Sequence, residues 1–231
     1  MRQSEKYKII EMRGVDKYYE LGDYITKAID SVDLDVYHGD LISIMGPSGS
    51  GKSTLLNLIG CLIKPTRGKI LIRGVNTMDL DDEQLSKLRG ETIGFIFQGY
   101  NLIPTLTALE NVLTPVLFSK GKTTHEDEEK AKELLKRVGL EERMSHFSRT
   151  LSYGEQQRVA IARSLMNDPE LILADEPTGT LDTYNAMQVM GILKGLNEEG
   201  ATIILVTHDP KVGEFGKTKY NLRDGKLFPA E

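Results

Sequence analysis

Residues 41–54 read LISIMGPSGSGKST, a short apolar run that leads into a glycine-rich loop. The loop fits the pattern G-x-x-x-x-G-K-[S/T], with Gly46, Gly51, Lys52 and Ser53 at its fixed positions. Glycines allow backbone angles that turn several N–H groups toward one point, and a helix that begins there adds the positive end of its dipole. Because an apolar strand precedes the loop and a helical stretch follows it, the sequence predicts a phosphate-binding loop rather than an ordinary glycine turn.

The side chains of this loop have separate tasks. Lys52 can reach the terminal phosphates of a nucleotide, and the hydroxyl of Ser53 can bind Mg²⁺. The residues that we expect to contact the bound nucleotide in this loop are Gly46, Pro47, Ser48, Gly49, Ser50, Gly51, Lys52, Ser53 and Thr54.

Other apolar runs resemble the one before the loop. Residues 92–97 (TIGFIF), 171–175 (LILAD) and 202–207 (TIILVT) alternate with helical stretches, which favours a parallel sheet covered on both faces. Residues 7–15 and 31–39 instead alternate apolar and polar side chains, which predicts half-buried strands. We therefore expect an α/β fold: a single domain over residues 1–231 with a P-loop NTPase core, a mostly parallel sheet and an N-terminal antiparallel β part. The mostly helical pattern between about 92 and 150 predicts an inserted helical subdomain.

Polar residues follow several of these predicted strands. Asp175 ends one strand and can hold Mg²⁺, and the adjacent Glu176 can polarise an attacking water molecule. An acidic pair at a strand end is often only a solvated turn, but the phosphate loop on the same chain favours the catalytic interpretation. Gln98 and His208 are by themselves ordinary loop or structural residues. Both nevertheless follow core strands, where ligands gather in open α/β sheets.

Composition limits the remaining classes of function. The formal net charge of −5 gives no overall basic footprint for nucleic acid. The single cysteine, Cys61, rules out an internal disulfide, and its apolar neighbours favour a small buried side chain over a reactive thiol. The N-terminal residues lack the apolar segment of a signal peptide, and no run of eighteen apolar residues occurs. We expect a cytosolic chain that can still attach to a membrane protein.

Six motifs in fixed order then resemble one family. They are GPSGSGKS, the FQ that ends at Gln98, LSYGEQ, LILADEP, the GTLD that ends at Asp182, and the THD that contains His208. Together they resemble the ATP-binding subunit of an ABC transporter over nearly the whole chain. The stretches NLIPTLTALENV and QQRVAIARSL are most similar to the branch that serves lipoprotein-release, macrolide-export and cell-division permeases (LolD, MacB and FtsE type).

The resemblance implies further roles and partners. Tyr19 aligns with the aromatic residue that stacks on adenine, although Tyr18 beside it leaves the register open. Gln98 is expected to contact Mg²⁺ or water and to sense the permease, His208 to hold the terminal phosphate, and Asp182 to help join two subunits. The implied ligands are ATP and Mg²⁺. The implied partners are a second copy of the chain and a membrane permease at the inner face of the membrane, with no nucleic acid.

The stretch LSYGEQQRVAIARS at 151–164 contains no complete catalytic constellation. In the family two subunits pair head to tail, and this signature turn faces the phosphate loop of the other subunit. Ser152, Gly154 and Glu155 are therefore expected to contact ATP in trans, with Tyr153 at the interface. The common form of the turn is LSGGQ, so Tyr153 and Glu155 are departures. From the sequence alone we expect Tyr153→Gly to preserve or tighten pairing, because a tyrosine adds bulk at a crowded contact. The alternative is that Tyr153 packs across the interface, in which case its loss weakens pairing.

Two other classes compete with a transporter motor. A non-transport ABC ATPase that acts on DNA or ribosomes is the main alternative, but the long coiled-coil or zinc insertions of the DNA-repair members are missing, as is a second cassette. An ordinary P-loop kinase or GTPase is disfavoured by the signature turn, by His208 and by the lack of an N-K-x-D motif after a strand. The sequence therefore predicts an ATPase that powers a transporter.

Overall fold

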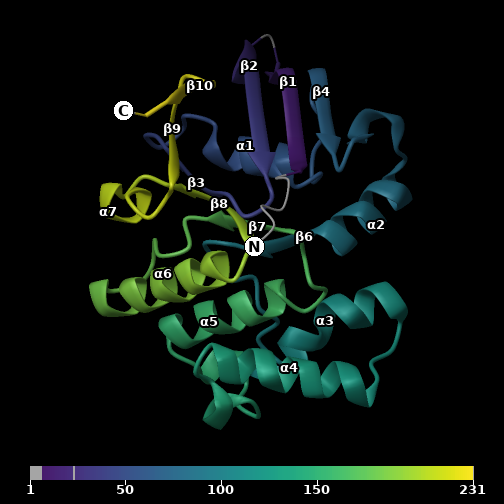
Figure 1. Cartoon of the computed structure of the whole chain (residues 1–231), viewed down its shortest axis with the longest axis vertical. Coiled ribbons are helices and arrows are strands. Elements are labelled where there is room, and N and C mark those ends of the chain that lie inside the picture. Colours follow the sequence, from purple (N-terminus) through teal and green to yellow (C-terminus); the bar gives the residue numbers. More distant parts are fainter. Residues whose placement is uncertain (1–6, 23, 231) are drawn as a thin grey trace, which may run out of the picture.

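The computed structural model describes residues 7–22 and 24–230. Residues 1–6, which belong to the stretch considered for a leader, lie outside the described residues. The described elements form two sheets with helices packed against them (Figure 1). None of the helices in this described part combines the length and the apolar character that a membrane crossing requires.

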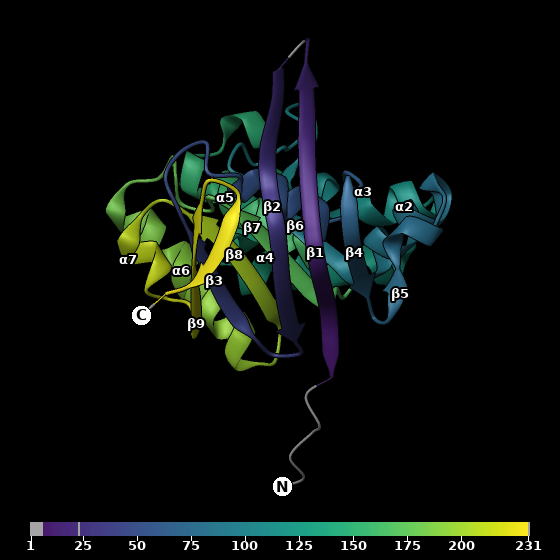
Figure 2. The same ribbon diagram turned by 90° about the horizontal axis from the view of Figure 1, so that it is seen from above.

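The first sheet is antiparallel, as the alternating N-terminal pattern predicts. It contains β1 (Lys8–Leu21), β2 (Tyr24–Tyr37), β4 (Arg67–Ile72) and β5 (Val75–Asn76), in the order β2-β1-β4-β5. The outer halves of β1 and β2 extend beyond the rest of the molecule as a two-stranded ribbon (Figure 2). The exposed residues of β2 lie mostly in this outer half, whereas its inner half alternates with buried positions.

The second sheet has the order β10-β9-β3-β8-β7-β6. Its strands β3 (Leu41–Met45), β6 (Ile93–Ile96), β7 (Leu171–Asp175), β8 (Thr202–Thr207) and β9 (Thr218–Arg223) pair in parallel, and β10 (Lys226–Pro229) is antiparallel to β9. This confirms the predicted parallel sheet. Because the strands run in one direction, the residues that follow β3, β6, β7 and β8 meet at one edge.

Successive residues of a strand point to opposite faces, so each buried strand serves two hydrophobic cores. Leu171 and Leu173 belong to the core between the two sheets, which also contains side chains of α1 (Lys52–Ile59). Ile172 and Ala174 belong to a second core beneath the parallel sheet. This alternation explains why the strand reads as one continuous apolar run.

Helices cover the second core. They are α3 (Ala108–Lys120), α4 (His125–Arg137), α5 (Tyr153–Ser164) and α6 (Thr183–Glu198), while α2 (Asp82–Thr92) and the short α7 (Pro210–Gly213) lie at the two sides (Figure 1). Helices α3 and α4 pack on each other and on α5. The subdomain boundaries near 92 and 150 stay a prediction; β6, just after the first of them, pairs within the parallel sheet.

Local signals explain the helix ends. Thr124 caps α4 through a reciprocal capping box with Asp127, and Gly139 just beyond its end has a positive φ of 73°. Helix α1 ends at Ile59 although apolar residues continue through Leu62, because Cys61 takes a left-handed conformation with φ 54°. An apolar pattern cannot report this change of direction.

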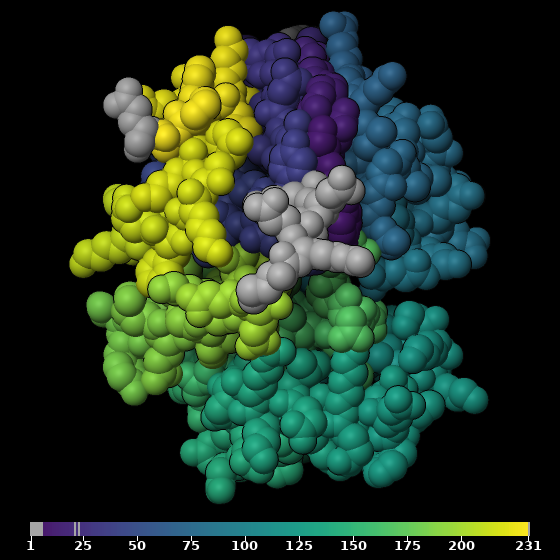
Figure 3. All heavy atoms as spheres, in the orientation of Figure 1, coloured from purple at the N-terminus to yellow at the C-terminus, as the bar shows by residue number. Residues whose placement is uncertain are grey.

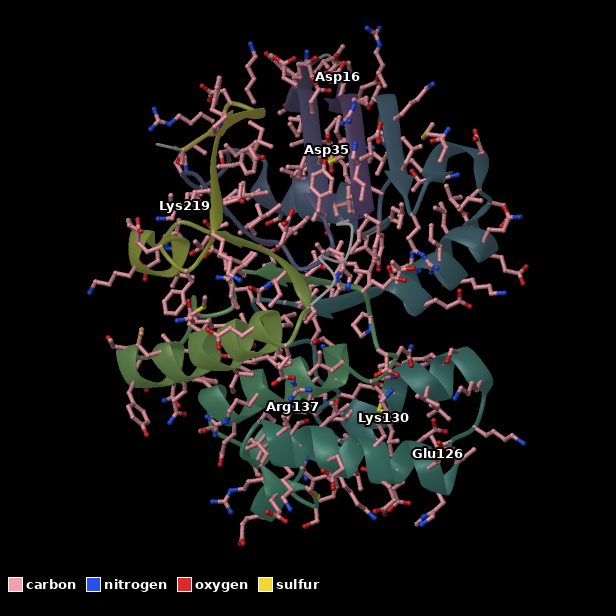
Figure 4. The ribbon with its side chains drawn as sticks, viewed as in Figure 1. Asp16, Asp35, Glu126, Lys130, Arg137 and Lys219 are labelled. Carbon is pink, nitrogen blue, oxygen red and sulfur yellow. The ribbon has the colours of Figure 1, made fainter. Side chains whose placement is uncertain are left out.

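Ion pairs fasten α4 to its surroundings. Lys130 pairs with Asp168 in the segment after α5, and Arg137 pairs with Glu199 at the end of α6. Figure 4 shows Lys130 and Arg137 along α4, with Glu126 near the start of the same helix. These contacts are largely exposed, so each stabilises the fold by only about 0–1 kcal/mol.

The buried thiol gives a first testable prediction. Cys61 is 7% exposed, and burial raises the pKa of its thiol to about 11. At pH 8 only about one thiol in a thousand is then ionised, and the thiolate is the reactive form. We expect Ellman's reagent to label the native chain negligibly and the urea-unfolded chain completely within minutes. Rapid labelling of the native chain would contradict this expectation.

Candidate functional site

A pocket of about 600 Å³ lies at the edge where the parallel strands end. The phosphate loop lines it through Ser48, Gly49, Gly51, Lys52, Ser53 and Thr54. Gln98, Glu176 and His208 line the same pocket, although they come from three other strand ends. The fold therefore brings together most of the side chains that the sequence predicts for one site. Asp175 does not line the pocket but accepts a hydrogen bond from Ser53, which does. Gly46, Pro47 and Ser50 belong to the loop but do not line the pocket.

The phosphate loop is held by its own lysine. Nζ of Lys52 donates hydrogen bonds to the carbonyl oxygens of Gly46 (2.9 Å) and Pro47 (3.0 Å). Gly51 has φ 103°, and a Cβ placed on it would lie 2.3 Å from the carbonyl oxygen of Ala28. Only glycine fits this position, both for its backbone angle and for its approach to β2.

The pair of Ser53 and Asp175 supplies hard oxygen ligands beside the loop. The Ser53 hydroxyl donates to Oδ1 of Asp175 at 3.4 Å, which brings α1 and the end of β7 together. Burial raises the pKa of the Asp175 carboxyl. Within the described ranges, no group of three or more His, Cys, Asp and Glu side chains could hold a metal. One carboxylate and one hydroxyl fit Mg²⁺, which takes its other ligands from water and phosphate oxygens.

Glu176 is fixed in place behind this pair. It is 9% exposed and has a left-handed backbone with φ 46°. Its Oε2 accepts a hydrogen bond from Oγ1 of Thr207 (3.1 Å), and its Oε1 lies 2.7 Å from Nδ1 of His208. A non-glycine residue in this conformation is strained, and such strain concentrates at functional sites. The carboxylate is thus aimed across the ends of β7 and β8.

The two tyrosines near residue 19 face different surroundings. Tyr19 is 39% exposed and lines the pocket, with Nζ of Lys17 5.4 Å from its ring centroid. The hydroxyl of Tyr18 instead donates to Asp16, and Nζ of Lys27 lies 5.3 Å from its ring centroid. Both tyrosines lie on β1 and pair with β2, but Tyr19 lines the pocket and Tyr18 does not.

The C-terminal hairpin contributes residues that sequence reasoning missed. The turn at Asp224 and Gly225 lines the pocket, and the Gly225 N–H donates to the carbonyl oxygen of Ser50 at 3.2 Å. Figure 3 shows the C-terminal segment beside β2, whose Asp30 N–H donates to the carbonyl oxygen of Gly225. The only sequence signal is the Asp-Gly pair, which marks a tight hairpin turn but not its target. Thr207 was also missed, although it directly precedes His208.

The signature turn, residues 151–155, lies away from this pocket. Ser152 caps α5 by accepting from the Glu155 N–H at 3.3 Å, and the Glu155 carboxylate accepts from the Ser152 N–H at 2.8 Å. Glu155 also pairs with Nε of Arg143 at 3.0 Å. No residue of the turn lines the pocket of its own chain. Ser152 and Tyr153 are exposed, so the start of α5 faces outward.

Gly154 and Asp182 meet through one asparagine. A Cβ on Gly154 would lie 2.4 Å from Oδ1 of Asn185, so the turn packs closely on the start of α6. Nδ2 of Asn185 donates to the Asp182 carboxylate at 2.7 Å. The structure therefore joins two motifs that the sequence separates by about thirty residues. Asn185 belongs to none of the motifs, so no pattern in the sequence predicts this contact.

The fold and the pocket define a nucleotide-hydrolysing P-loop protein. Residues 29–179 match the protein family described as ABC transporter, and the chain belongs to that family. It is 51% identical over 223 residues to an uncharacterized ABC transporter ATP-binding protein, MJ0796, of Methanocaldococcus jannaschii, with 95% of each chain covered. It is 49% identical to the macrolide export ATP-binding/permease protein MacB of Hyphomonas neptunium, over 95% of this chain and 34% of that protein.

Solved structures agree with this assignment. A dimeric structure of the MJ0796 cassette has a TM-score of 0.87 and 50% sequence identity, and covers 94% of this chain and 96% of that one. A dimeric post-hydrolysis state of MJ0796 bound to ADP and Pi has a TM-score of 0.89 and 48% identity, with 96% and 97% covered. The chain is an ATP-binding and ATP-hydrolysing subunit of an ABC transporter. This confirms the predicted class and its branch.

Proposed function

We propose that two copies of this chain close head to tail around two ATP molecules and thereby drive a membrane permease. The observation that carries this proposal is the outward-facing start of α5, whose Ser152 lies outside the pocket of its own chain. The positive end of a helix suits a phosphate, and the second copy can supply one. The dimeric form of the similar MJ0796 cassette supports the same arrangement.

In this proposal each site takes residues from both copies. Tyr19 stacks on the adenine, the loop from Gly46 to Thr54 surrounds the phosphates, and Lys52 moves from its loop carbonyls to the terminal phosphates. Ser152, Gly154 and Glu155 of the second copy close the site, while Tyr153 and Asp182 lie at the interface. ATP then binds the closed dimer more tightly than the open chains, which gives the cycle its driving force.

Hydrolysis depends on the residues at the ends of β7 and β8. Glu176 orients a water molecule and takes up its proton as the water attacks the terminal phosphate. His208 contacts that phosphate, and Thr207 keeps the Glu176 carboxylate in place. Ser53, Asp175 and Gln98 would hold Mg²⁺, which neutralises charge on the phosphate oxygens. Gln98 is exposed just after β6, and in this proposal it also senses the permease.

The permease partner has a separate line of support. The similar MacB protein is described as an ATP-binding/permease protein, and this chain matches about a third of it, 34%. We propose that this chain works with a permease and lies at the cytoplasmic face of the membrane. The net charge of −5 supports a partner other than nucleic acid. Copurification of a membrane permease would support this part, and copurification of ribosomes or DNA would oppose it.

Cross-linking tests the head-to-tail arrangement. One chain carries Ser48→Cys and a second, differently tagged chain carries Ser152→Cys, both in a Cys61→Ser background. ATP should promote a disulfide between the two chains, because each cysteine lies on one side of the same composite site. Catalytic turnover would reopen the dimer, so Glu176→Gln is added to both chains.

The control replaces Ser48→Cys with Ser86→Cys, an exposed position on α2 away from the phosphate loop. This pair should not link in the presence of ATP. A Ser48–Ser152 link that forms equally without nucleotide, or that never forms, would overturn the arrangement in trans while leaving the ATP pocket of the single chain intact.

A further inference from the structure

Tyr100 contacts two motif segments besides its own. It is 8% exposed and follows Gln98 by two residues. Its hydroxyl is hydrogen-bonded to that of Thr180, which lies between Glu176 and Asp182. Its ring stacks on the ring of Tyr153 in the signature turn, with centroids 6.3 Å apart and planes inclined by 27°. Stacked rings at this separation attract each other beyond their burial alone.

The backbone around Tyr100 is held by the same helix that carries the signature turn. The guanidinium of Arg163, near the end of α5, donates to the carbonyl oxygens of Tyr100 (2.7 Å) and Asn101. Tyr100 and Asn101 have backbone φ values of 59° and 49°, in the left-handed region that residues other than glycine rarely adopt. Both ends of helix α5 thus contact the segment after Gln98: its start contacts the segment through Tyr153, and its end through Arg163.

We infer that Tyr100 is a positioning residue: its stack on Tyr153 holds the signature turn in the position from which the turn can close the composite site. The inference rests on the proposed function, because the turn acts on the ATP of the second copy. Tyr153 directly follows Ser152, so the ring contact fixes the residue that closes the composite site. A displacement of the segment after Gln98 then displaces the turn. On this inference, removal of the Tyr153 ring should weaken pairing, whereas the sequence alone leads us to expect preserved or tighter pairing.

A double-mutant cycle tests this contact. In a Glu176→Gln background, the variants Tyr153→Ala, Tyr100→Leu and the double substitution are compared by the ATP concentration that gives half-maximal dimer in sedimentation. Each single substitution should raise that concentration roughly threefold to tenfold. The double substitution should raise it no more than the larger single effect, because both remove the same contact.

Two further measurements separate positioning from general damage. Tyr153 is 67% exposed, so Tyr153→Ala should leave the thermal midpoint and the affinity of the monomer for a fluorescent ATP analogue unchanged. Tyr153→Phe keeps the ring and should dimerise like the parent. The matched control Tyr24→Ala removes a tyrosine that is 80% exposed on the β1–β2 ribbon, and it should also behave like the parent.

The outcomes distinguish this inference from the proposed function. A parent chain that stays monomeric with ATP overturns both. A parent that dimerises, together with additive effects of the two substitutions, overturns the positioning role alone. If the buried Tyr100→Leu variant does not fold, the Tyr153 series decides: parent-like pairing of Tyr153→Ala overturns the inference, and weak pairing rescued by Tyr153→Phe supports it.

Discussion

Replacement of Glu176 by glutamine is expected to lower the rate of ATP hydrolysis by roughly 10²- to 10⁴-fold, the range that a general base contributes. Glutamine keeps the size of the side chain and can still meet Thr207 and His208, but it cannot take up a proton from water. ATP binding needs no such base and should survive. The variant should therefore accumulate as an ATP-bound dimer.

Steady-state phosphate release and gel filtration with and without ATP measure the two effects. Glu133→Gln is the matched control, because it makes the same change at an exposed position of α4. The control should hydrolyse ATP at the parent's rate. A Glu176→Gln chain with the parent's rate would remove this residue from the role of base, and low activity without a dimer would place the defect in binding.

Replacement of Lys52 by alanine is expected to abolish measurable turnover and to weaken ATP binding by roughly 10- to 100-fold, the value of charged hydrogen bonds to phosphate. In the structure the ammonium group also bridges the carbonyl oxygens of Gly46 and Pro47, so its loss also loosens the loop. Titration with a fluorescent ATP analogue and a coupled hydrolysis assay measure the two effects. Lys87→Ala on α2 is the control and should leave both unchanged.

A mixture of two inactive chains extends this prediction. One chain carries Lys52→Ala and the other carries Ser152→Arg, which places a bulky side chain where the partner's phosphate is expected. In the mixed dimer both lesions fall on one composite site, and the other site is intact. Partial hydrolysis should return if a single intact site turns over, which mixing at several ratios would reveal. Ser152→Arg should also block ATP-dependent pairing while the monomer still binds ATP.

Much of the candidate site was predictable because its motifs are contiguous in the chain. Each motif occupies a short stretch in which residue type and spacing indicate the chemistry. These motifs are the glycine loop, the two carboxylates at the end of β7 and the histidine that follows β8. The parallel sheet then brings strand ends to one edge, so Gln98, Glu176 and His208 were expected to gather there. The positions of helix ends were less certain, as α1 shows by ending at Ile59.

By itself, the sequence determined the phosphate loop, the order of the motifs and the α/β class, because these follow from residue type and spacing along the chain. Only the tertiary structure decided which tyrosine lines the pocket, that the turn at Gly225 holds Ser50, and that Tyr153 stacks on Tyr100. Such contacts join residues far apart in the chain. Their geometry depends on strand register and on the packing of helices against the sheet, and no local pattern encodes either.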